Sequence, residues 1–371
     1  MTQANGMWRQ FDVVLFIATL ILTVFGIVMI RSATLEAVDP DLINRVPDQI
    51  RFAILGVLIM FGLAALDYRI LGSINLYLYV LMIALLFLVT IFGVEGDGGA
   101  QSWLNLGFIR IQPSELAKVL IIITLGSYLA ANFRKMDSVW TVIKAAVHIG
   151  IPSVLIFIQP DLGMTIVFAV MWFVMVWAAG LRLKHIAIFT LVVMLTVPLT
   201  VPVVWSRMEN YQRERITSFI FPESDRDAYY NILQARISIG SGGFFGKGYA
   251  RGPQNTGRFL RVRHTDFIFS VIAEEFGFVG GVVVIVLIGV VIARVLRGAR
   301  IASDPFGSLL CYGVATFIFF QTFVSIGMNL SLMPVTGLTL PFISSGGTSL
   351  LSTLIGIGLA QSVIMRRRRL T

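Results

Sequence analysis

Apolar residues are gathered along this 371-residue chain in long runs separated by polar connections. A run of about 20 predominantly apolar residues is long enough to cross a bilayer as an α-helix. The pattern predicts an all-α polytopic membrane protein, a single domain over residues 1–371 with about ten transmembrane helices. The expected spans lie near 12–31, 50–67, 71–93, 113–131, 139–158, 162–180, 185–205, 267–296, 306–328 and 339–365. The first run is too long for a cleaved signal peptide, so we expect it to stay as the first span, with both termini on one side.

Composition supports this prediction, because 57% of the residues are hydrophobic and only 13% are charged. That leaves too little polar surface to cover a soluble globule of this length. The one cysteine, Cys311, stands in an apolar stretch. A disulfide framework within the chain is therefore excluded, and Cys311 is interpreted as a small core or lipid-facing residue.

Basic residues in the short connections indicate the orientation of the chain in the membrane. One face collects Arg9, Arg69, Arg134, Lys135, Arg182, Lys184, Arg294, Arg297, Arg300 and Arg366 to Arg369. An excess of Lys and Arg marks cytoplasmic loops, so this face, with both termini, is predicted to be cytoplasmic. The net charge of +9 is thus interpreted as a topological signal, and nucleic acid is not expected as a partner.

A long loop between the seventh and eighth spans, residues 206–265, is predicted on the extracytoplasmic face yet is basic. Its cations are Arg207, Arg213, Arg215, Arg226, Arg236, Lys247, Arg251, Arg258, Arg261 and Arg263. Long loops cross the membrane regardless of charge, so the orientation is unaffected. The loop is either a solvated segment attracted to anionic headgroups or a binding surface for an anionic substrate at the outer membrane surface. Its other contents favour the second interpretation.

Asp266 ends the charged run 261–266, directly before the eighth apolar span. A carboxylate among cations beside a bilayer suits the removal of a proton from one group while an anionic leaving group is stabilised. His264 is interpreted as a hydrogen-bonding loop residue or as a second candidate base. On a helix Glu274 points within about 80° of Asp266, whereas Glu275 points nearly opposite. Glu274 therefore shares the Asp266 site, or both glutamates pair with neighbouring spans.

Glycines are concentrated in residues 240–248, which include Lys247. The segment resembles a phosphate-binding P-loop only superficially, since Ser241 stands where the first glycine belongs and Gly248 follows the lysine in place of Ser or Thr. A nucleotide site is therefore not expected. Two interpretations stay open: the backbone amides beside Lys247 bind a pyrophosphate, or the segment forms a simple turn.

The fourth span has Pro113 at a first helical position and two charges three residues apart, Glu115 and Lys118. Unpaired charges inside a bilayer are costly, so we expect these two to pair, either as a structural ion pair or as part of a cavity near a substrate. Trp103, in the loop before this span, is interpreted as a membrane-interface residue or as packing against a bound sugar. Asp161 is expected to cap the helix that follows it.

Residues 333–348 interrupt the last spans with proline and small residues. Irregular backbone at membrane depth is tolerated where it is buried in protein or lines a cavity. A cavity is therefore predicted to open outward at this segment.

Several motifs together resemble the SEDS family of shape, elongation, division and sporulation proteins, over essentially the whole chain. They are residues 99–103, 112–118, 159–163, 264–269 with Glu274 and Glu275, and 334–347. Within the family, residues 211–213, 222–225 and 239–248 are more similar to RodA, the elongation member, than to FtsW, the division member. Two positions depart from the pattern, with Val262 in place of an expected Glu and Ser345 in place of an expected aromatic residue.

The resemblance implies a peptidoglycan glycosyltransferase that polymerises lipid II, a disaccharide pentapeptide on undecaprenyl pyrophosphate, outside the cytoplasmic membrane during cell elongation. A β-1,4 link made from an α-linked donor inverts the anomeric carbon, and a single displacement needs one base, for which Asp266 is the candidate. The cations available for the leaving pyrophosphate are Lys247, Arg251, Arg258, Arg261 and Arg263. The matching family positions associate Trp103, Glu115 and Lys118 with the central cavity and activity.

The resemblance also implies partners: a class B penicillin-binding transpeptidase, lipid II, the growing glycan strand and membrane lipid. No cluster of His, Cys and carboxylates has metal-ligand spacing, so no metal site is expected, and a divalent cation would be held only between phosphates and Asp266. Two other functions stay open, a lipid II flippase and a non-catalytic scaffold for a cell-wall synthase. An essential carboxylate at the outer mouth favours the enzyme, because a carrier distributes essential charges through the whole span.

Overall fold

The computed structural model of the chain describes residues 7–35, 40–94, 102–105, 107, 110–182, 226–260 and 262–367, with isolated residues between 194 and 217. Within these residues, nine apolar helices form a bundle. They are α2 (Val13–Thr34), α4 (Arg45–Ala65), α6 (Asn75–Phe92), α7 (Pro113–Ala131), α8 (Val139–Ile158), α9 (Leu162–Ala178), α14 (Ile268–Ile301), α15 (Pro305–Asn329) and α16 (Gly347–Met365). Eight are long and apolar enough to cross a membrane, and α9 is a shorter apolar helix of 17 residues.

Shorter elements lie in the connections between these helices. They are α3 (Pro40–Ile43), α5 (Tyr68–Ser73), the 3-10 helix η1 (Phe133–Lys135), α12 (Arg226–Gly242), α13 (Pro253–Thr256), β1 (Leu104–Asn105) and β2 (Arg110–Ile111). The two strands pair antiparallel, with Leu104 opposite Ile111.

The prediction of an all-α polytopic membrane protein is confirmed, and nine of the ten expected spans coincide with the nine helices. The expected span 185–205 lies outside the described residues, apart from isolated positions. The last span was expected from residue 339, whereas α16 begins at Gly347. Pro334 and Pro341 explain the difference, because proline removes a helical hydrogen bond and clashes with the preceding turn. Residues 340–345 are instead buried as irregular backbone.

Capping residues explain where several helices begin. Asp12, Asp161 and Asp304 each accept a hydrogen bond from the backbone amide three residues ahead, at 3.0, 2.9 and 2.9 Å respectively. The expected cap at Asp161 is thereby confirmed. Pro113 and Pro305 occupy first-turn positions of α7 and α15, where a missing N–H leaves no helical bond unmade.

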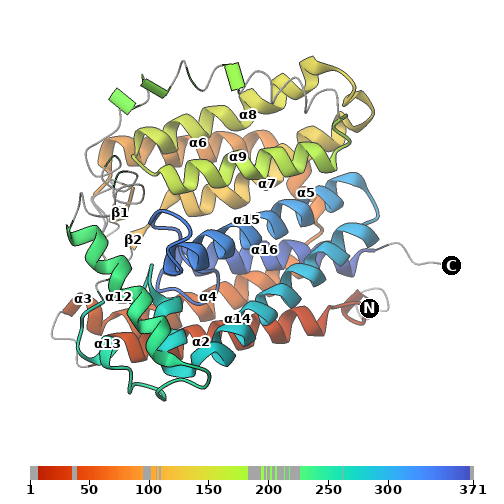
Figure 1. Cartoon of the computed structure of the whole chain (residues 1–371). Coiled ribbons are helices and arrows are strands. Elements are labelled where there is room, and N and C mark those ends of the chain that lie inside the picture. The colour runs from red at the N-terminus through yellow and green to blue at the C-terminus, as the bar shows by residue number, and fades with distance from the viewer. Residues whose placement is uncertain are drawn as a thin grey trace.

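The most buried helix is α16, which packs against α4, α7, α14 and α15. The buried share of its most apolar stretch is 89%, compared with 72% for α15, 67% for α7 and 17% for α6. Figure 1 shows α16 between α15 and α4. Gly358 permits the close contact with α4, since a Cβ at this position would lie 2.9 Å from backbone atoms of Met60.

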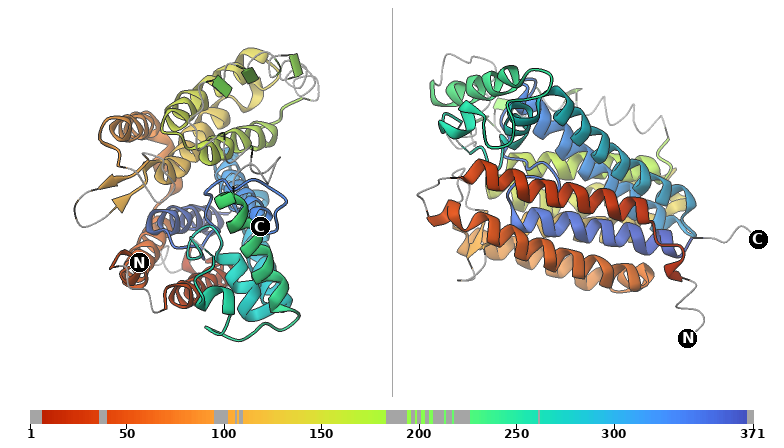
Figure 2. Two further views of the ribbon diagram at one scale, coloured as in Figure 1. Left: turned by 60° about the vertical axis from the view of Figure 1, so that its left-hand side comes forward. Right: turned by 90° about the horizontal axis from the view of Figure 1, so that it is seen from below.

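The two ends of the bundle carry different elements and contacts. At one end α2 begins and α16 ends, and there the Asp12 amide donates to Gln361 Oε1 at 3.0 Å and Arg294 pairs with Asp12 at 2.6 Å. The opposite end carries α12 and α13 (Figures 1 and 2). The start of α2 and the end of α16 thus lie at the same end of the bundle, and the side of the membrane on which the termini lie stays a prediction.

Candidate active site

Asp266 lies in the turn 262–267, directly before α14 begins at Ile268, and is partly exposed. This turn is at the end of the bundle that carries α12 and α13. The positive end of a helix dipole favours a negative charge, so the N-terminus of α14 stabilises the ionised carboxylate that a base requires. Val262 opens the turn with a φ of 51°, a left-handed conformation that is unfavourable for a β-branched residue. Such a conformation persists only where the surroundings hold the backbone.

The connection between α15 and α16 holds the backbone beside Asp266. His264 O accepts a hydrogen bond from Ser345 N at 2.9 Å, and Thr265 O accepts one from Ser344 Oγ at 2.8 Å. Ser345 donates through its backbone, so the replacement of the expected aromatic residue leaves this bond intact. His264 is itself buried, and its role as a second base stays a prediction.

The carbonyl of Asp266 accepts a hydrogen bond from Asn329 Nδ2 at 2.8 Å. Asn329 is the last residue of α15 and is fully buried. Its side-chain oxygen accepts from Ser270 N at 3.0 Å and from Ser270 Oγ at 2.6 Å. Asn329 is not among the site residues predicted from the sequence. The one available signal is the recurrence of Gln321, Ser325 and Asn329 every four residues along an apolar helix.

Gln49 of α4 fixes the connection between α15 and α16 in turn. Its Nε2 donates to Ser344 O at 3.2 Å, and its Oε1 accepts from Gly346 N at 3.1 Å. Gln49 is buried. The predicted interruption of the last spans is therefore confirmed as irregular buried backbone, and the cavity expected beside it stays a prediction.

Glu115 and Lys118 pair inside the bundle, as expected from their spacing, with Nζ and Oε2 at 2.6 Å and exposed fractions of 3% and 0%. Lys118 also donates to Gln321 Oε1 at 2.9 Å, and Glu115 accepts from Ser352 Oγ at 3.0 Å. The ammonium lies 4.9 Å from the centre of the Phe317 ring. The pair therefore joins α7 to α15 and α16, and a contact with substrate stays a prediction.

Trp103 lies in a short antiparallel contact before α7. Val94 N donates to Trp103 O at 2.8 Å, and Trp103 N donates to Val94 O at 3.4 Å. The indole is partly exposed. Both predicted roles, at the membrane interface and against a sugar, stay predictions.

The predicted cations differ in exposure. Lys247, Arg251 and Arg258 are exposed. Arg263 is buried, and its Nε donates to Ala33 O, at the end of α2, at 2.6 Å. Burial, followed by the nearby positive charge of Arg258, lowers the pKa of Arg263. Arg263 therefore holds the Asp266 turn against α2. Its buried guanidinium adds to the positive electrostatic potential of this region without reaching the surface.

Arg261, the remaining predicted cation, lies outside the described residues. Its contact with a leaving group stays a prediction.

Glu274 and Glu275 bind the loop that carries the exposed cations Lys247, Arg251 and Arg258. Glu274 accepts from the amides of Gln254 and Asn255 at 2.8 and 3.2 Å. Glu275 accepts from Asn255 Nδ2 at 2.8 Å and from Ser32 Oγ of α2. Both glutamates are buried. The geometry favours the interpretation in which they pair with neighbouring elements, and a contact of Glu274 with substrate stays a prediction.

The glycine-rich segment 240–248 packs against the first half of α14. Two of its amides donate to α14, Lys247 N to Glu274 O at 3.0 Å and Gly248 N to Glu275 O at 2.9 Å, and Gly246 N donates within the segment to Gly242 O at 2.8 Å. The interpretation in which these three amides bind a pyrophosphate is therefore wrong. The side chain of Lys247, which is exposed, is the group that remains for an anion.

Gly277 breaks α14 where the glycine-rich segment meets it, with φ 67° and ψ −163°. The break frees backbone amides, and Phe278 N donates to Gly243 O at 2.9 Å instead of to its own helix. A Cβ at Gly277 would lie 2.4 Å from Gly246 N. The loop and the helix thus approach backbone to backbone.

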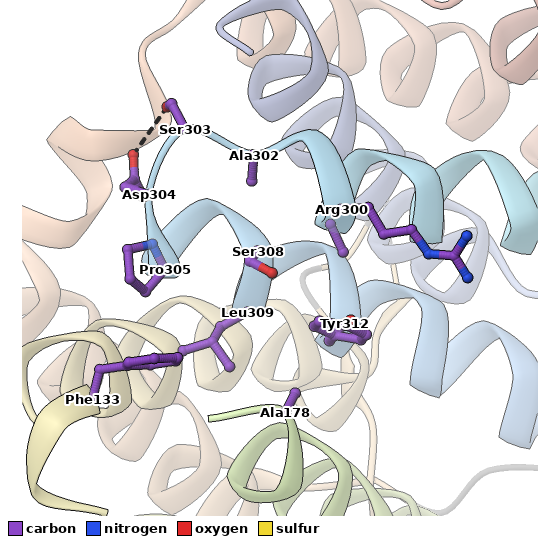
Figure 3. Close-up of a pocket in the computed structure, with 11 residues that line it drawn as sticks. Phe133, Ala178, Arg300, Ala302, Ser303, Asp304, Pro305, Ser308, Leu309 and Tyr312 are labelled. Atoms are coloured by element: carbon purple, nitrogen blue, oxygen red, sulfur yellow. Dashed lines mark hydrogen bonds between the residues drawn. The ribbon is translucent and has the colours of Figure 1, made fainter. Parts of the chain in front are cut away.

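A hollow of about 430 Å³ lies at the other ends of α14 and α15 (Figure 3). The Asp304 carboxylate on its rim already accepts from Tyr68 and Arg69. The guanidinium of Arg300 extends away from the other lining residues (Figure 3). This hollow is separated from Asp266 by the length of α14 and is not part of the candidate site.

Within the described ranges, no group of three or more His, Cys, Asp or Glu residues is placed to hold a metal ion. A divalent cation bridged by substrate phosphates and Asp266 stays a prediction.

Known proteins match this chain in sequence and in fold over nearly its full length. Peptidoglycan glycosyltransferase MrdB of Escherichia coli (strain K12) is 36% identical over 369 residues, which cover 97% of this chain and 95% of that protein. A chain of a solved peptidoglycan synthase complex, described as coordinating polymerization and crosslinking, has a TM-score of 0.80 at 33% identity and covers 95% of this chain and 97% of its own. The crystal structure of the rod shape determining protein RodA of Thermus thermophilus has a TM-score of 0.71 at 31% identity, covering 97% and 98%.

A family profile described as cell cycle protein, which groups FtsW, RodA and SpoVE, matches residues 12–369. The match covers every helix of the bundle, the Asp266 turn and the buried Glu115–Lys118 pair. The chain therefore belongs to the FtsW, RodA and SpoVE family.

Proposed function

We infer that this protein is a peptidoglycan glycosyltransferase in which Asp266 is the general base. The observation that carries it is a partly exposed carboxylate at the start of α14, on a backbone held by hydrogen bonds, at the end of α14 against which the loop with the exposed cations packs. The names of its relatives support the reaction class. The RodA-like relatives support a role in elongation in preference to division.

The proposed substrate is lipid II, and the reaction is a single displacement. The 4-hydroxyl oxygen of the acceptor sugar forms a bond to the anomeric carbon of the donor, and the bond from that carbon to the pyrophosphate oxygen breaks. The hydroxyl proton passes to the Asp266 carboxylate, and the electron pair leaves with the pyrophosphate. Both substrates are held at one membrane surface, which replaces a bimolecular encounter with a positioned one.

The leaving pyrophosphate requires positive charge in place of a general acid. Lys247, Arg251 and Arg258 are exposed on the described part of the loop beside α14 and are proposed to bind the pyrophosphate. Arg263, which is buried against α2, is proposed to hold the turn and to add to the local positive potential. Trp103, with its partly exposed indole, is proposed to contact the sugar.

The site is proposed to face the extracytoplasmic side. The end of the bundle where α2 begins carries most of the Lys and Arg of the short connections, which is typical of a cytoplasmic face. Among the described residues these are Arg9, Arg69, Arg134, Lys135, Arg182, Arg294, Arg297, Arg300, Arg366 and Arg367. Asp266 lies at the other end, which supports the proposal that it faces outside the cytoplasm.

A transpeptidase is the proposed protein partner. One structural relative is a chain of a complex described as coordinating polymerization and crosslinking. Crosslinking of glycan strands is transpeptidation, so a class B penicillin-binding protein is the enzyme that fits this pairing.

The test is Asp266→Asn, assayed for polymer formation from purified lipid II with and without the transpeptidase. Loss of the base is expected to lower the rate on the order of 10²-fold or more, while binding of lipid II persists. The matched control is Asp48→Asn, at the same end of the bundle, where Asp48 forms an exposed pair with Arg51 at 3.0 Å. Exposed pairs contribute little, so this variant should keep its activity.

Full polymerisation by Asp266→Asn would refute the base assignment. Vesicles that contain lipid II on one leaflet separate the enzyme from a carrier. Transbilayer movement of lipid II without polymer, in the presence of the transpeptidase, would establish the flippase alternative in place of the enzyme.

A further inference from the structure

One buried carboxamide joins the end of α15 to the start of α14. The last four carbonyls of a helix and its first amides have no partner within the helix. Asn329 Nδ2 donates to Ser325 O at 2.7 Å, one turn before the end of α15, which fixes the orientation of the carboxamide. Its Oδ1 accepts from Ser270 N at 3.0 Å, an amide in the first turn of α14 that also donates to Phe267 O at 3.0 Å.

The start of α14 receives this contact from another helix because its own N-cap residue supplies no side-chain cap. The N-cap position is Phe267, which has no side-chain hydrogen bond to the helix. In most helices a Ser, Thr, Asp or Asn at that position accepts from an amide of the first turn. Here Asn329, 59 positions away from Ser270, takes this role from a neighbouring helix.

The same carboxamide reaches the residue proposed as the base. Asn329 Nδ2 also donates to Asp266 O at 2.8 Å. The backbone of Asp266 is thereby tied to α15, whose most apolar stretch is 72% buried. The exposed fraction of Asn329 is 0%, so water does not compete for these bonds.

We propose that Asn329 is a positioning residue for Asp266, acting through the backbone of the turn that carries the carboxylate. This proposal rests on the proposed function, in which Asp266 takes the proton of the acceptor hydroxyl. A base works only within hydrogen-bond reach of that proton, and a misplacement of about 1 Å can cost on the order of 10²-fold in rate. Asn is suited to the position because one planar group both donates and accepts.

The test compares Asn329→Ala with two variants that separate its contacts. Ser270→Ala removes one bond to Oδ1 and leaves the bond from Asn329 to Asp266 O in place. Ser325→Ala is the matched control, because this hydroxyl lies one turn away on the same face of α15 and is buried without a partner among the described residues. Its backbone carbonyl, which Asn329 uses, is unchanged.

Turnover and lipid II dependence are measured with the protein and its transpeptidase partner. For Asn329→Ala we expect kcat to fall about 10- to 100-fold while KM changes less than about twofold, since the substrate contacts stay in place. Ser270→Ala and Ser325→Ala should retain kcat within about threefold. If Asn329→Ala yields no folded protein, Asn329→Asp applies the same test, because it keeps the acceptor for Ser270 and loses the Nδ2 donor.

Hydrogen exchange of the peptide that covers residues 264–270 supplies a readout independent of activity. It should quicken in Asn329→Ala and stay unchanged in Ser325→Ala. An unchanged kcat, or activity lost only in proportion to folded protein, would overturn the positioning role. Unchanged exchange would overturn the tie to the backbone. A wild-type protein without polymerising activity would instead refute the proposed function. The exchange experiment does not require activity, so the two failures can be told apart.

Discussion

Glu115 and Lys118 show how a charged pair is accommodated inside a membrane bundle. Each side chain has the other as a partner and one further polar contact, to Ser352 and Gln321 respectively. Removing two charges from water is costly, and their attraction offsets this cost only when the remaining polar atoms are also bonded. The pair is therefore sensitive to the loss of one member and far less sensitive to the loss of both.

Glu115→Gln is expected to destabilise the protein by about 3 kcal/mol, because it leaves the Lys118 ammonium buried without a counter-charge. The measurement is the thermal unfolding of the purified protein in detergent. The double variant Glu115→Leu, Lys118→Met should recover most of the lost stability, since it removes both charges.

Activity of that double variant decides between the two interpretations of the pair. Recovery of both stability and polymerisation would identify a structural ion pair. Recovery of stability without polymerisation would assign the pair to the substrate cavity. A Glu115→Gln protein as stable as the wild type would contradict the argument from burial.

At the scale of elements, α14 is broken at Gly277, and its N-terminal part packs against the glycine-rich segment 240–248. The break frees backbone amides of α14, which donate hydrogen bonds to carbonyls of the loop. Amides of the loop in turn donate hydrogen bonds to carbonyls of α14. This exchange leaves no room for a side chain between the two backbones. The position of Lys247 and Arg251 thus depends on a glycine more than 20 residues further along the chain.

Gly277→Ala is expected to undock this loop. An alanine at a φ of 67° is strained by about 1–3 kcal/mol, and its Cβ would also lie 2.4 Å from Gly246 N. We expect faster proteolysis of the segment 240–258 and a lower rate of polymerisation. Gly289→Ala on the same helix is the control, because a Cβ there meets nothing within 4 Å. Equal proteolysis of both variants would show that the break is dispensable.

The sequence predicted those elements whose determinants are local. Apolar runs located nine helices, Asp161 was expected as a cap, and the spacing of Glu115 and Lys118 indicated their pair. Contacts between distant segments could not be predicted in this way. Asn329 and Asp266 are 63 positions apart, and a single Asn at the end of an apolar helix does not indicate which backbone it will bind.

At the scale of the whole molecule, a polar cluster outside the membrane-spanning helices holds the elements together at the end of the bundle opposite the candidate site. Tyr68 OH and Arg69 both donate to Asp304, which also caps α15. Burial alone would raise the pKa of Asp304, but the hydrogen bonds from Tyr68, the amide of Gly307 and Arg69 outweigh it and hold the pKa below its ordinary value. The cluster ties α5 to the turn between α14 and α15.

Tyr68 makes this cluster sensitive to alkaline pH. Burial, followed by its hydrogen bond to Asp304, raises the pKa of Tyr68 from 10.0 to about 12. A group whose pKa is higher in the folded state adds stability that is complete below its unfolded pKa and is lost as the pH rises through the folded pKa. Between pH 10 and 12 the wild type should therefore lose up to about 2 kcal/mol of its stability advantage over Tyr68→Phe, measured by thermal unfolding. The exposed Tyr77→Phe is the control, and parallel pH profiles of wild type and Tyr68→Phe would show that this cluster does not fasten the bundle.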